Sequence, residues 1–140
     1  MAENNIFEIN TRGHCDVINI TPQLEKFIQD TEEEGALLVF VLGTTAALTI
    51  IEYEEGIIKD LQEMLEKIAP QNFDYHHHKR WGDFNGAAHL RSALIGPSLV
   101  VPFKGKALQL GTWQQVVLVD FDEKPRCRQI LIKILTTIHK

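Results

Sequence analysis

The stretch "ALLVFVLGTTAALTIIEY", Ala36 to Tyr53, is the most strongly patterned part of this 140-residue sequence. Residues 36–42 are all apolar, which is typical of a strand covered on both faces. A glycine and two threonines follow and indicate a bend. The apolar residues after them predict a second strand that lies beside the first.

The residues before this stretch predict an opening hairpin and a helix. Residues 6–10 and 14–21 have strand patterns on either side of a turn at residues 11–13. Thr21 is placed to cap a helix in which Pro22 takes the first position, because proline lacks an N–H that would be unsatisfied there.

The residues after this stretch predict two more helices and then strands. From Glu55 onward apolar residues recur every three or four positions until Pro70, which predicts a helix. Residues 86–95 predict another helix, and residues 75–85 a histidine-rich loop before it. Since the last third alternates short strands with turns, we expect an α+β fold: a single compact domain, residues 1–140, with a large mixed or antiparallel β-sheet and a few helices.

Composition argues against several classes of protein. A net charge of -5 with scattered basic residues is unlike a nucleic-acid-binding surface. The sequence has neither a signal-peptide pattern nor an apolar run of about 20 residues, so we expect a cytoplasmic protein with no membrane partner. Cys15 and Cys127 are predicted to be reduced thiols, and neither is a candidate nucleophile.

The segment "YHHHKRWGDFNGAAHLRSALIGPS", Tyr75 to Ser98, holds four of the six histidines. His77 or His78 could converge with His89 on a metal ion, and Asp83 could be a ligand, a partner that orients an imidazole, or a general base. The competing interpretation is that His89 is a buried helix residue with a structural role. Three consecutive histidines cannot all point the same way, and we expect His76 to be solvated.

Other polar residues have two interpretations each. Glu52 ends an apolar strand, where it could bind metal or be an ordinary polar boundary. Arg91 and Ser98 could bind phosphate or lie on the surface. Thr112 and Gln114 could orient a polar ligand, or belong to a strand edge beside a packed tryptophan.

Three motifs together resemble the YjbQ-like family: "GTTAALTIIEYEEGIIKDL", "YHHHKRWGDFNGAAHLRSALIGPSLVVPF" and "LGTWQQVVLVDFDEKPRCRQILIKI". The resemblance implies a compact α+β fold, assembly as a homotrimer or a multiple of it, and sites near subunit boundaries. It also implies a secondary thiamine-phosphate synthase activity. This transferase joins a pyrimidine pyrophosphate to a thiazole phosphate and releases pyrophosphate.

The family pattern falls on named residues of this chain. It implies catalytic roles for Glu52, Asp83 and His89, with Asn85 beside them, and a divalent metal, zinc or magnesium, held by His77 and His89. Residues expected to bind the phosphorylated metabolite are Arg91, Ser98, Thr112, Trp113 and Gln114, with Trp113 offering an aromatic face to the pyrimidine.

The chain departs from the pattern at two positions. Many relatives have histidine where this sequence has Gly43, although glycine also occurs there, and many have histidine where it has Ala87. Because Ala87 removes a likely imidazole ligand, metal binding is expected to be weaker, to recruit His78 or Asp83, or to give way to an anion. Two other functions stay open. One is a non-catalytic trimeric protein that binds a metal or a phosphorylated metabolite, and the other is a hydrolase that uses metal-bound water.

Overall fold

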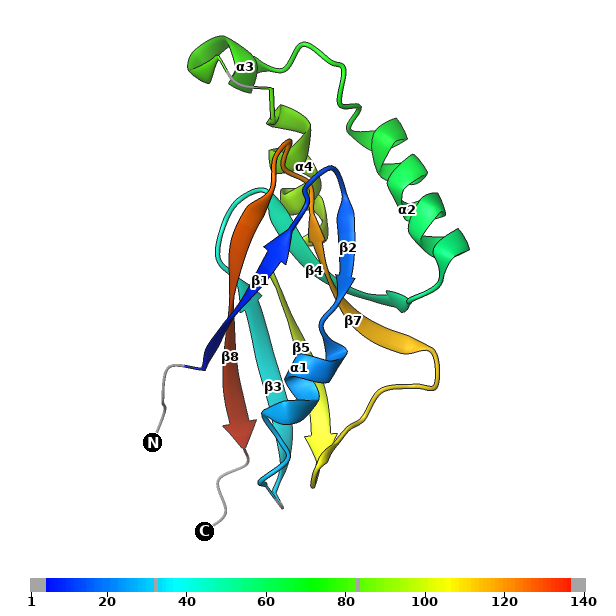
Figure 1. The fold of residues 1–140 in the computed structure, drawn as a ribbon, viewed down its shortest axis with the longest axis vertical. Helices are drawn as coiled ribbons and strands as arrows, with labels where there is room; N and C mark the ends of the chain where they lie inside the picture. Colours follow the sequence, from blue (N-terminus) through cyan, green and yellow to red (C-terminus); the bar gives the residue numbers. More distant parts are fainter. Residues whose placement is uncertain (1–4, 32, 83, 137–140) are drawn as a thin grey trace.

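A computed structural model describes residues 5–31, 33–82 and 84–136 (Figure 1). These residues form eight strands and four helices. In chain order they are β1 (Ile6–Thr11), β2 (Asp16–Asn19), α1 (Thr21–Lys26), β3 (Glu34–Val41), β4 (Ala46–Glu52), α2 (Glu55–Ile68), α3 (His76–Trp81), α4 (Gly86–Ile95), β5 (Ser98–Lys104), β6 (Ala107–Leu108), β7 (Gln114–Asp120) and β8 (Arg126–Thr136).

The strands form two antiparallel sheets. The five-stranded sheet has the order β1-β8-β3-β5-β6, and the three-stranded sheet has the order β2-β7-β4. The predicted α+β class is confirmed, and so are the helices over residues 55–68 and 86–95. The β-structure is divided between two sheets rather than gathered in one.

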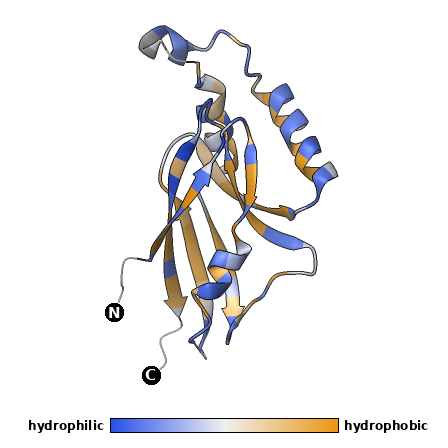
Figure 2. Ribbon diagram, in the orientation of Figure 1, coloured by the Kyte–Doolittle hydropathy of each residue, from blue (hydrophilic) through white to orange (hydrophobic). Residues whose placement is uncertain are grey.

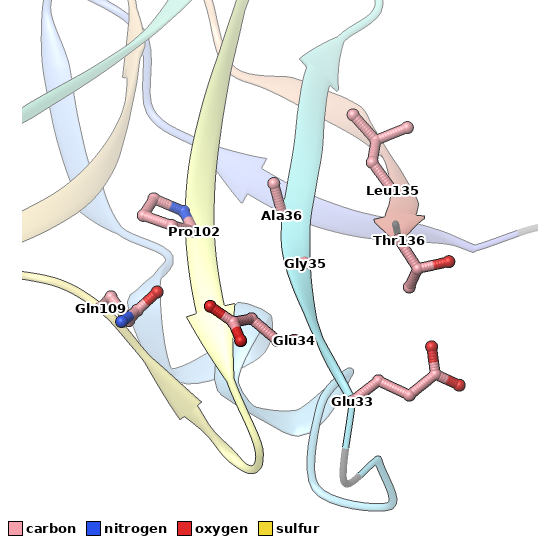
Figure 3. A pocket seen from close by; sticks show the side chains of 8 residues that line it. All are labelled: Glu33, Glu34, Gly35, Ala36, Pro102, Gln109, Leu135 and Thr136. Atoms are coloured by element: carbon pink, nitrogen blue, oxygen red, sulfur yellow. The ribbon is translucent and has the colours of Figure 1, made fainter. Parts of the chain in front are cut away.

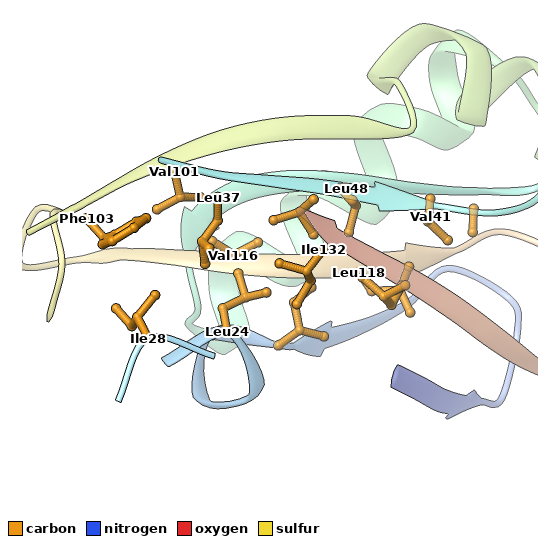
Figure 4. Packing of buried hydrophobic residues seen from close by; sticks show 14 residues of the cluster. Leu24, Ile28, Leu37, Val41, Leu48, Val101, Phe103, Val116, Leu118 and Ile132 are labelled. Atoms are coloured by element: carbon orange, nitrogen blue, oxygen red, sulfur yellow. The ribbon is translucent and has the colours of Figure 1, made fainter. Parts of the chain in front are cut away.

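The main core lies between the two sheets (Figure 4). Leu37, Val39 and Val101 of the five-stranded sheet meet Val116 and Leu118 of the three-stranded sheet, and all five are fully buried. Helix α1 adds Leu24 and Ile28 to the same core. The alternation of buried and partly exposed residues along these strands is what a two-sheet packing requires.

Helices α2 and α4 cover the other face of the three-stranded sheet. Leu65 of α2 and Ala88 of α4 pack with Val117, Val119 and Phe121 in a second apolar cluster. Glu54 begins α2 by accepting hydrogen bonds from the N–H groups of residues 56 and 57. The result is three layers, with the smaller sheet in the middle. None of the described helices is long and apolar enough to cross a lipid bilayer.

The outer face of the five-stranded sheet is apolar and uncovered. Strand β3 was predicted to be covered on both faces, but only alternate residues such as Leu37 and Val39 are buried. Pairing places Leu38 and Phe40 on the opposite face, beside Val100 of β5. Val100 is 55% exposed. Figure 2 shows the apolar residues along β3 and β8. The sequence predicts that both faces of β3 are covered, but within the described residues of one chain no layer packs on this outer face.

Two predicted strand pairings are wrong. Strands β1 and β2 do not form a hairpin, because β1 pairs with β8 and β2 pairs with β7. Gly13, His14 and Cys15 between them all have positive φ, and this left-handed turn carries the chain from one sheet to the other. Strand β4 likewise pairs with β7 rather than with β3. The bend at residues 42–45 connects the two sheets.

Two local predictions also need correction. Thr21 lies within α1 and does not cap it; its hydroxyl accepts a hydrogen bond from the N–H of Val116 at 2.8 Å. Asn19 supplies the acceptor for the Thr21 N–H at 3.0 Å. The histidine-rich segment is not wholly a loop, because residues 76–81 form the short helix α3.

A buried ionic cluster joins the two sheets at one end. Arg128 of β8 donates two hydrogen bonds to Asp120 of β7, at 2.7 and 2.8 Å, and one to the hydroxyl of Thr45 at 2.6 Å. Thr11 of β1 also donates to Asp120, and Thr45 donates to Asp122 at 2.9 Å. Asp120 is fully buried, and Arg128 is 7% exposed.

Asp122 stays ionised within this cluster. Burial raises the pKa of its carboxyl group, but hydrogen bonds from Thr45 and the Glu123 N–H, together with the charge of Arg126, outweigh burial and leave the pKa below its ordinary value. The Asp122 carboxylate therefore carries a charge, which Arg126 and Arg128 neutralise. The cluster is a set of charge-assisted bonds in a dry setting.

We expect Arg128→Ala to lower the free energy of unfolding by about 3–5 kcal/mol, because Asp120 would remain buried without its cation. Lys59→Ala is the control: the side chains of Lys59 and Glu55 are 67% and 83% exposed where they pair. That change should cost about 1 kcal/mol or less. Urea denaturation of both variants measures the difference. Similar losses for the two would show that the buried cluster is not the stronger link.

Candidate functional site

The rings of His77 of α3 and His89 of α4 lie next to each other, tilted, at one end of the molecule. Their ring centroids are 4.4 Å apart, with the planes inclined by 40°. Both rings line a hollow of about 350 Å³, which we call the histidine hollow, together with Tyr75, His76, Gly86 and Leu90. The structure thus brings together two of the predicted site residues from different helices.

Asn85 sets the position of His89. It immediately precedes α4, its side chain is 8% exposed, and its carbonyl accepts the His89 N–H at 3.2 Å. His89 therefore lies in the first turn of the helix, on the side that faces α3. Ala87 is fully buried and does not line the hollow. Asp83, a predicted catalytic residue, lies outside the described residues.

His78 has a structural role that the sequence did not indicate. Its Nε2 accepts the N–H of Gly86 at 3.2 Å, and its ring contacts Tyr75 edge-on at 5.5 Å. A Cβ on Gly86 would lie 2.9 Å from the Cβ of Tyr75 and 3.0 Å from Nε2 of His78. The start of α4 can approach α3 this closely only because residue 86 is glycine. His76, by contrast, is exposed as predicted, although it contributes to the rim of the hollow.

Arg91 and Ser92 fasten α4 to its neighbours. The guanidinium of Arg91 donates to the carbonyl of Ala69 at 3.1 and 2.8 Å and to Glu66 at 2.7 Å, so it binds the end of α2. Ser92 donates to the carbonyl of Ala46 at 2.6 Å. Nε and Nη2 of Arg91 are thus engaged within the fold.

Glu52 lies at the opposite end of β4 from the histidine pair. Ser92 contacts Ala46, the first residue of β4, and the carbonyl of Gly96 accepts the N–H of Leu48, so α4 and β4 run in the same direction. His89 precedes Ser92 by one turn, whereas Glu52 is six residues beyond Ala46, about 20 Å along the strand. Glu52 therefore does not stand beside the histidines of its own chain.

The other polar candidates are also remote from the histidine pair. Glu52 pairs with Gln114, so the Thr112–Gln114 segment lies with Glu52 at the far end of the smaller sheet. Trp113 there is 71% exposed, and the Gln114 side chain closes its own turn by accepting the Gly111 N–H at 2.7 Å. Ser98 begins β5 beyond the last turn of α4 and is exposed.

Two imidazoles are fewer ligands than a zinc site in a protein requires. Over residues 5–31, 33–82 and 84–136 no three histidine, cysteine, aspartate or glutamate side chains converge as metal ligands. A metal held by His77 and His89 would need a further donor from Asp83 or from another subunit. The two imidazoles alone suffice to contact an anion through N–H donors.

Burial raises the pKa of the Cys15 thiol to about 11, which agrees with its exclusion as a nucleophile.

Sequence reasoning missed the apolar walls of the hollow. Tyr75 and Leu90 were not candidates, because an aromatic residue and a leucine near helices are ordinary core residues in a sequence. One signal was available: Gly86 opens a helix, where glycine is unfavourable unless close packing requires it.

Comparisons with known proteins show which proteins this chain is similar to. Residues 5–137 match the family described as UPF0047 protein YjbQ-like. A UPF0047 protein of Archaeoglobus fulgidus is 38% identical over 127 residues, which cover 91% of this chain and 97% of that protein. The UPF0047 protein YugU of Bacillus subtilis is 33% identical over 130 residues, with 91% and 96% covered.

Solved structures show the same fold. A hypothetical protein of Aeropyrum pernix is similar with a TM-score of 0.86 at 30% identity, over 97% of this chain and all of that one. A YbjQ-like protein of unknown function from Sulfolobus solfataricus gives a TM-score of 0.84 at 27% identity, over 96% and 99% of the two chains.

We expect His78→Ala to lower the free energy of unfolding by about 1–3 kcal/mol, because the Gly86 N–H would lose its acceptor. His77→Ala and His89→Ala should leave stability within about 1 kcal/mol, since these rings line a hollow rather than fill the core. Chemical denaturation of the three variants distinguishes the roles. A larger loss for His89→Ala than for His78→Ala would support the structural interpretation of His89.

Proposed function

This chain belongs to the YjbQ-like UPF0047 family, and on that premise we propose that its histidine hollow binds the phosphate groups of a small phosphorylated metabolite. The proposed activity is that of a thiamine-phosphate synthase-like transferase. The observation that carries the proposal is the facing pair His77 and His89, with ring centroids 4.4 Å apart on the wall of a hollow of about 350 Å³.

The chemistry of imidazole fits a phosphate ligand. An imidazole N–H can donate to a phosphate oxygen, and hydrogen bonds to a charged acceptor are stronger than neutral ones. For His77 that donor would be Nε2, because its Nδ1 is buried. The rings come from two helices whose positions are fixed by the contacts of His78 and Arg91. Donors that are held in place before the ligand arrives stabilise developing charge without further reorganisation.

In the proposed reaction the bond between the pyrimidine methylene carbon and a pyrophosphate oxygen breaks. The pyrophosphate leaves with the electron pair, and the methylene carbon forms a bond to the thiazole ring. His77 and His89 would bind the departing pyrophosphate and stabilise its negative charge. A divalent metal ion held by the two rings and a further donor would take the place of their N–H groups and would itself supply positive charge there.

We propose that the working unit is a homotrimer or a multiple of it. Two features support assembly: the uncovered apolar face of the five-stranded sheet, and the distance of Glu52 from the histidine pair within one chain. Apolar faces of this extent are typical of subunit interfaces. Glu52, Thr112, Trp113 and Gln114 would take part in the same site only if they came from a neighbouring subunit. Residues of this outer face include Ile6, Leu38, Phe40, Val100, Pro102, Leu131 and Leu135.

A hollow of about 730 Å³ lies on the same face (Figure 3). Glu33 and Glu34 lie along one side of it, and Pro102 and Leu135 come from the strands on either side of β3. A subunit that covers the apolar face would also reach this hollow. Its acidic rim favours a partner surface with basic residues such as Lys133, which the same sheet carries.

We expect untagged protein to bind inorganic pyrophosphate. We expect His77→Ala and His89→Ala each to abolish this binding, because either variant keeps only one of the two imidazoles that donate N–H groups to the phosphate oxygens. His14→Asn is the control, since His14 does not line the histidine hollow and asparagine tolerates its positive φ. Calorimetry with and without Zn²⁺ or Mg²⁺ measures the affinity. Release of pyrophosphate from the pyrimidine ester, with the thiazole phosphate present, measures the transfer.

The outcomes separate the candidate functions. Binding without transfer would support the non-catalytic binding protein, and pyrimidine alcohol formed without thiazole phosphate would support the hydrolase. Absence of pyrophosphate binding under all metal conditions would contradict the proposal.

We expect Val100→Glu to dissociate the assembly, because a carboxylate would have to be buried in an apolar interface. Met64→Glu on α2 is the matched control, since Met64 is also about half exposed but lies on a different layer. Light scattering at micromolar concentration measures both. A wild-type monomer under these conditions would contradict the proposed assembly.

A further inference from the structure

Four aromatic rings form a continuous arc beside the histidine hollow. Phe73 lies 4.9 Å from Tyr75, Tyr75 lies 5.5 Å from His78, and His78 lies 5.2 Å from Phe84, measured between ring centroids. The last two contacts are edge-to-face, the favourable geometry for aromatic pairs.

The ends of the arc line a second hollow of about 490 Å³, which we call the aromatic hollow. Its walls are Gln71, Asn72, Phe73, Asp74, His78 and Phe84. Phe73 is 60% exposed and Phe84 is 64% exposed. Two phenylalanines that are mostly exposed in one hollow have large apolar faces available to a ligand.

Hydrogen bonds hold the arc in place. The Tyr75 hydroxyl donates to the carbonyl of Pro70 at 2.6 Å, and His78 accepts the Gly86 N–H. Gln71 donates to the carbonyl of Phe84 at 2.9 Å, which joins the two ends of the hollow. The rings are therefore positioned before any ligand binds, which lowers the entropy cost of binding.

The two hollows adjoin each other. Tyr75 lines the histidine hollow, His78 lines the aromatic hollow, and these two rings touch edge-on. A ligand with a flat ring and a phosphate arm could place one part in each hollow by crossing the rim between them. Trp113, the ring predicted to stack on the pyrimidine, lies at the far end of the same chain.

We propose that the aromatic hollow binds the flat, nitrogen-containing aromatic ring of the metabolite whose phosphate binds in the histidine hollow. This inference rests on the proposed function. Phe73 and Phe84 offer faces for stacking, which every planar heterocycle can use. Asn72 and Asp74 at the rim supply an amide and a carboxylate for ring nitrogens and amino groups.

The test compares three probes: inorganic pyrophosphate, a 4-aminopyrimidine alcohol without phosphate, and the pyrophosphate ester of that alcohol. Phe84→Ala and Phe73→Ala should each weaken binding of the alcohol and the ester by about tenfold, the loss expected for one stacked ring. Binding of inorganic pyrophosphate should not change. Tyr53→Ala is the control and should change none of the three affinities, because Tyr53 is 44% exposed and lines neither hollow. Phe84→Tyr should restore ester binding.

Several results would overturn the inference. One is equal ester affinity for wild type and both phenylalanine variants. Another is ester binding that depends on Trp113 and not on Phe73 or Phe84. A third is loss of the assembly in Phe84→Ala, which would show that the hollow is covered by another subunit. If the wild type binds no pyrophosphate the proposed function fails, whereas the alcohol alone still tests the aromatic hollow.

Discussion

The buried contact between Arg128 and Asp120 is the constraint on which the two-sheet arrangement depends. Asp120 ends β7 in the smaller sheet, and Arg128 lies near the start of β8 in the larger one. Neither charge can be removed from water alone without a large cost, so each sheet fixes the position of the other. Gly43 belongs to the same arrangement, because a Cβ there would lie 2.9 Å from a guanidinium nitrogen of Arg128. The positive φ of Gly43, 132°, also favours glycine where the chain passes from one sheet to the other.

The candidate site inherits its geometry from the smaller sheet. Helix α4 is attached to β4 by the hydrogen bond from the Ser92 hydroxyl to the Ala46 carbonyl. The hydrogen bond from Arg91 to the Ala69 carbonyl attaches α4 to the end of α2. The start of α4, with His89, projects beyond the edge of the sheet toward α3. The two histidines can therefore meet in a hollow at the end of the layers without displacing any residue from the core. This separation of binding residues from core residues allows the site to vary while the fold is kept.

The distribution of the remaining candidates points to a functional unit larger than one chain. Glu52 and Gln114 lie at one end of the smaller sheet and the histidines at the other. The larger sheet presents an apolar face that a single chain leaves in water. An assembly that covered this face could bring the two groups of residues together, and the aromatic arc beside the histidines supplies a ring-binding surface that needs no second chain. In the first arrangement several subunits recognise the ligand, and in the second a single subunit does.

The sequence by itself determined the local elements. The spacing of apolar residues from Glu55 to Ile68, and glycine and proline after residue 95, marked α2 and α4 correctly, because helix periodicity and chain breakers act within a few residues. The motifs also identified the family and the pair His77 and His89.

Only the tertiary structure decided which strands pair, since alternation shows which face is buried but not which partner lies alongside. It placed β4 beside β7 and β1 beside β8, and so moved Glu52 away from the histidines. Asp120 and Arg128 are only eight residues apart, yet their contact was not predicted, because it forms where the chain leaves the smaller sheet and enters the larger one. Contacts between residues far apart in sequence depend on the packing of whole layers, which no local pattern specifies.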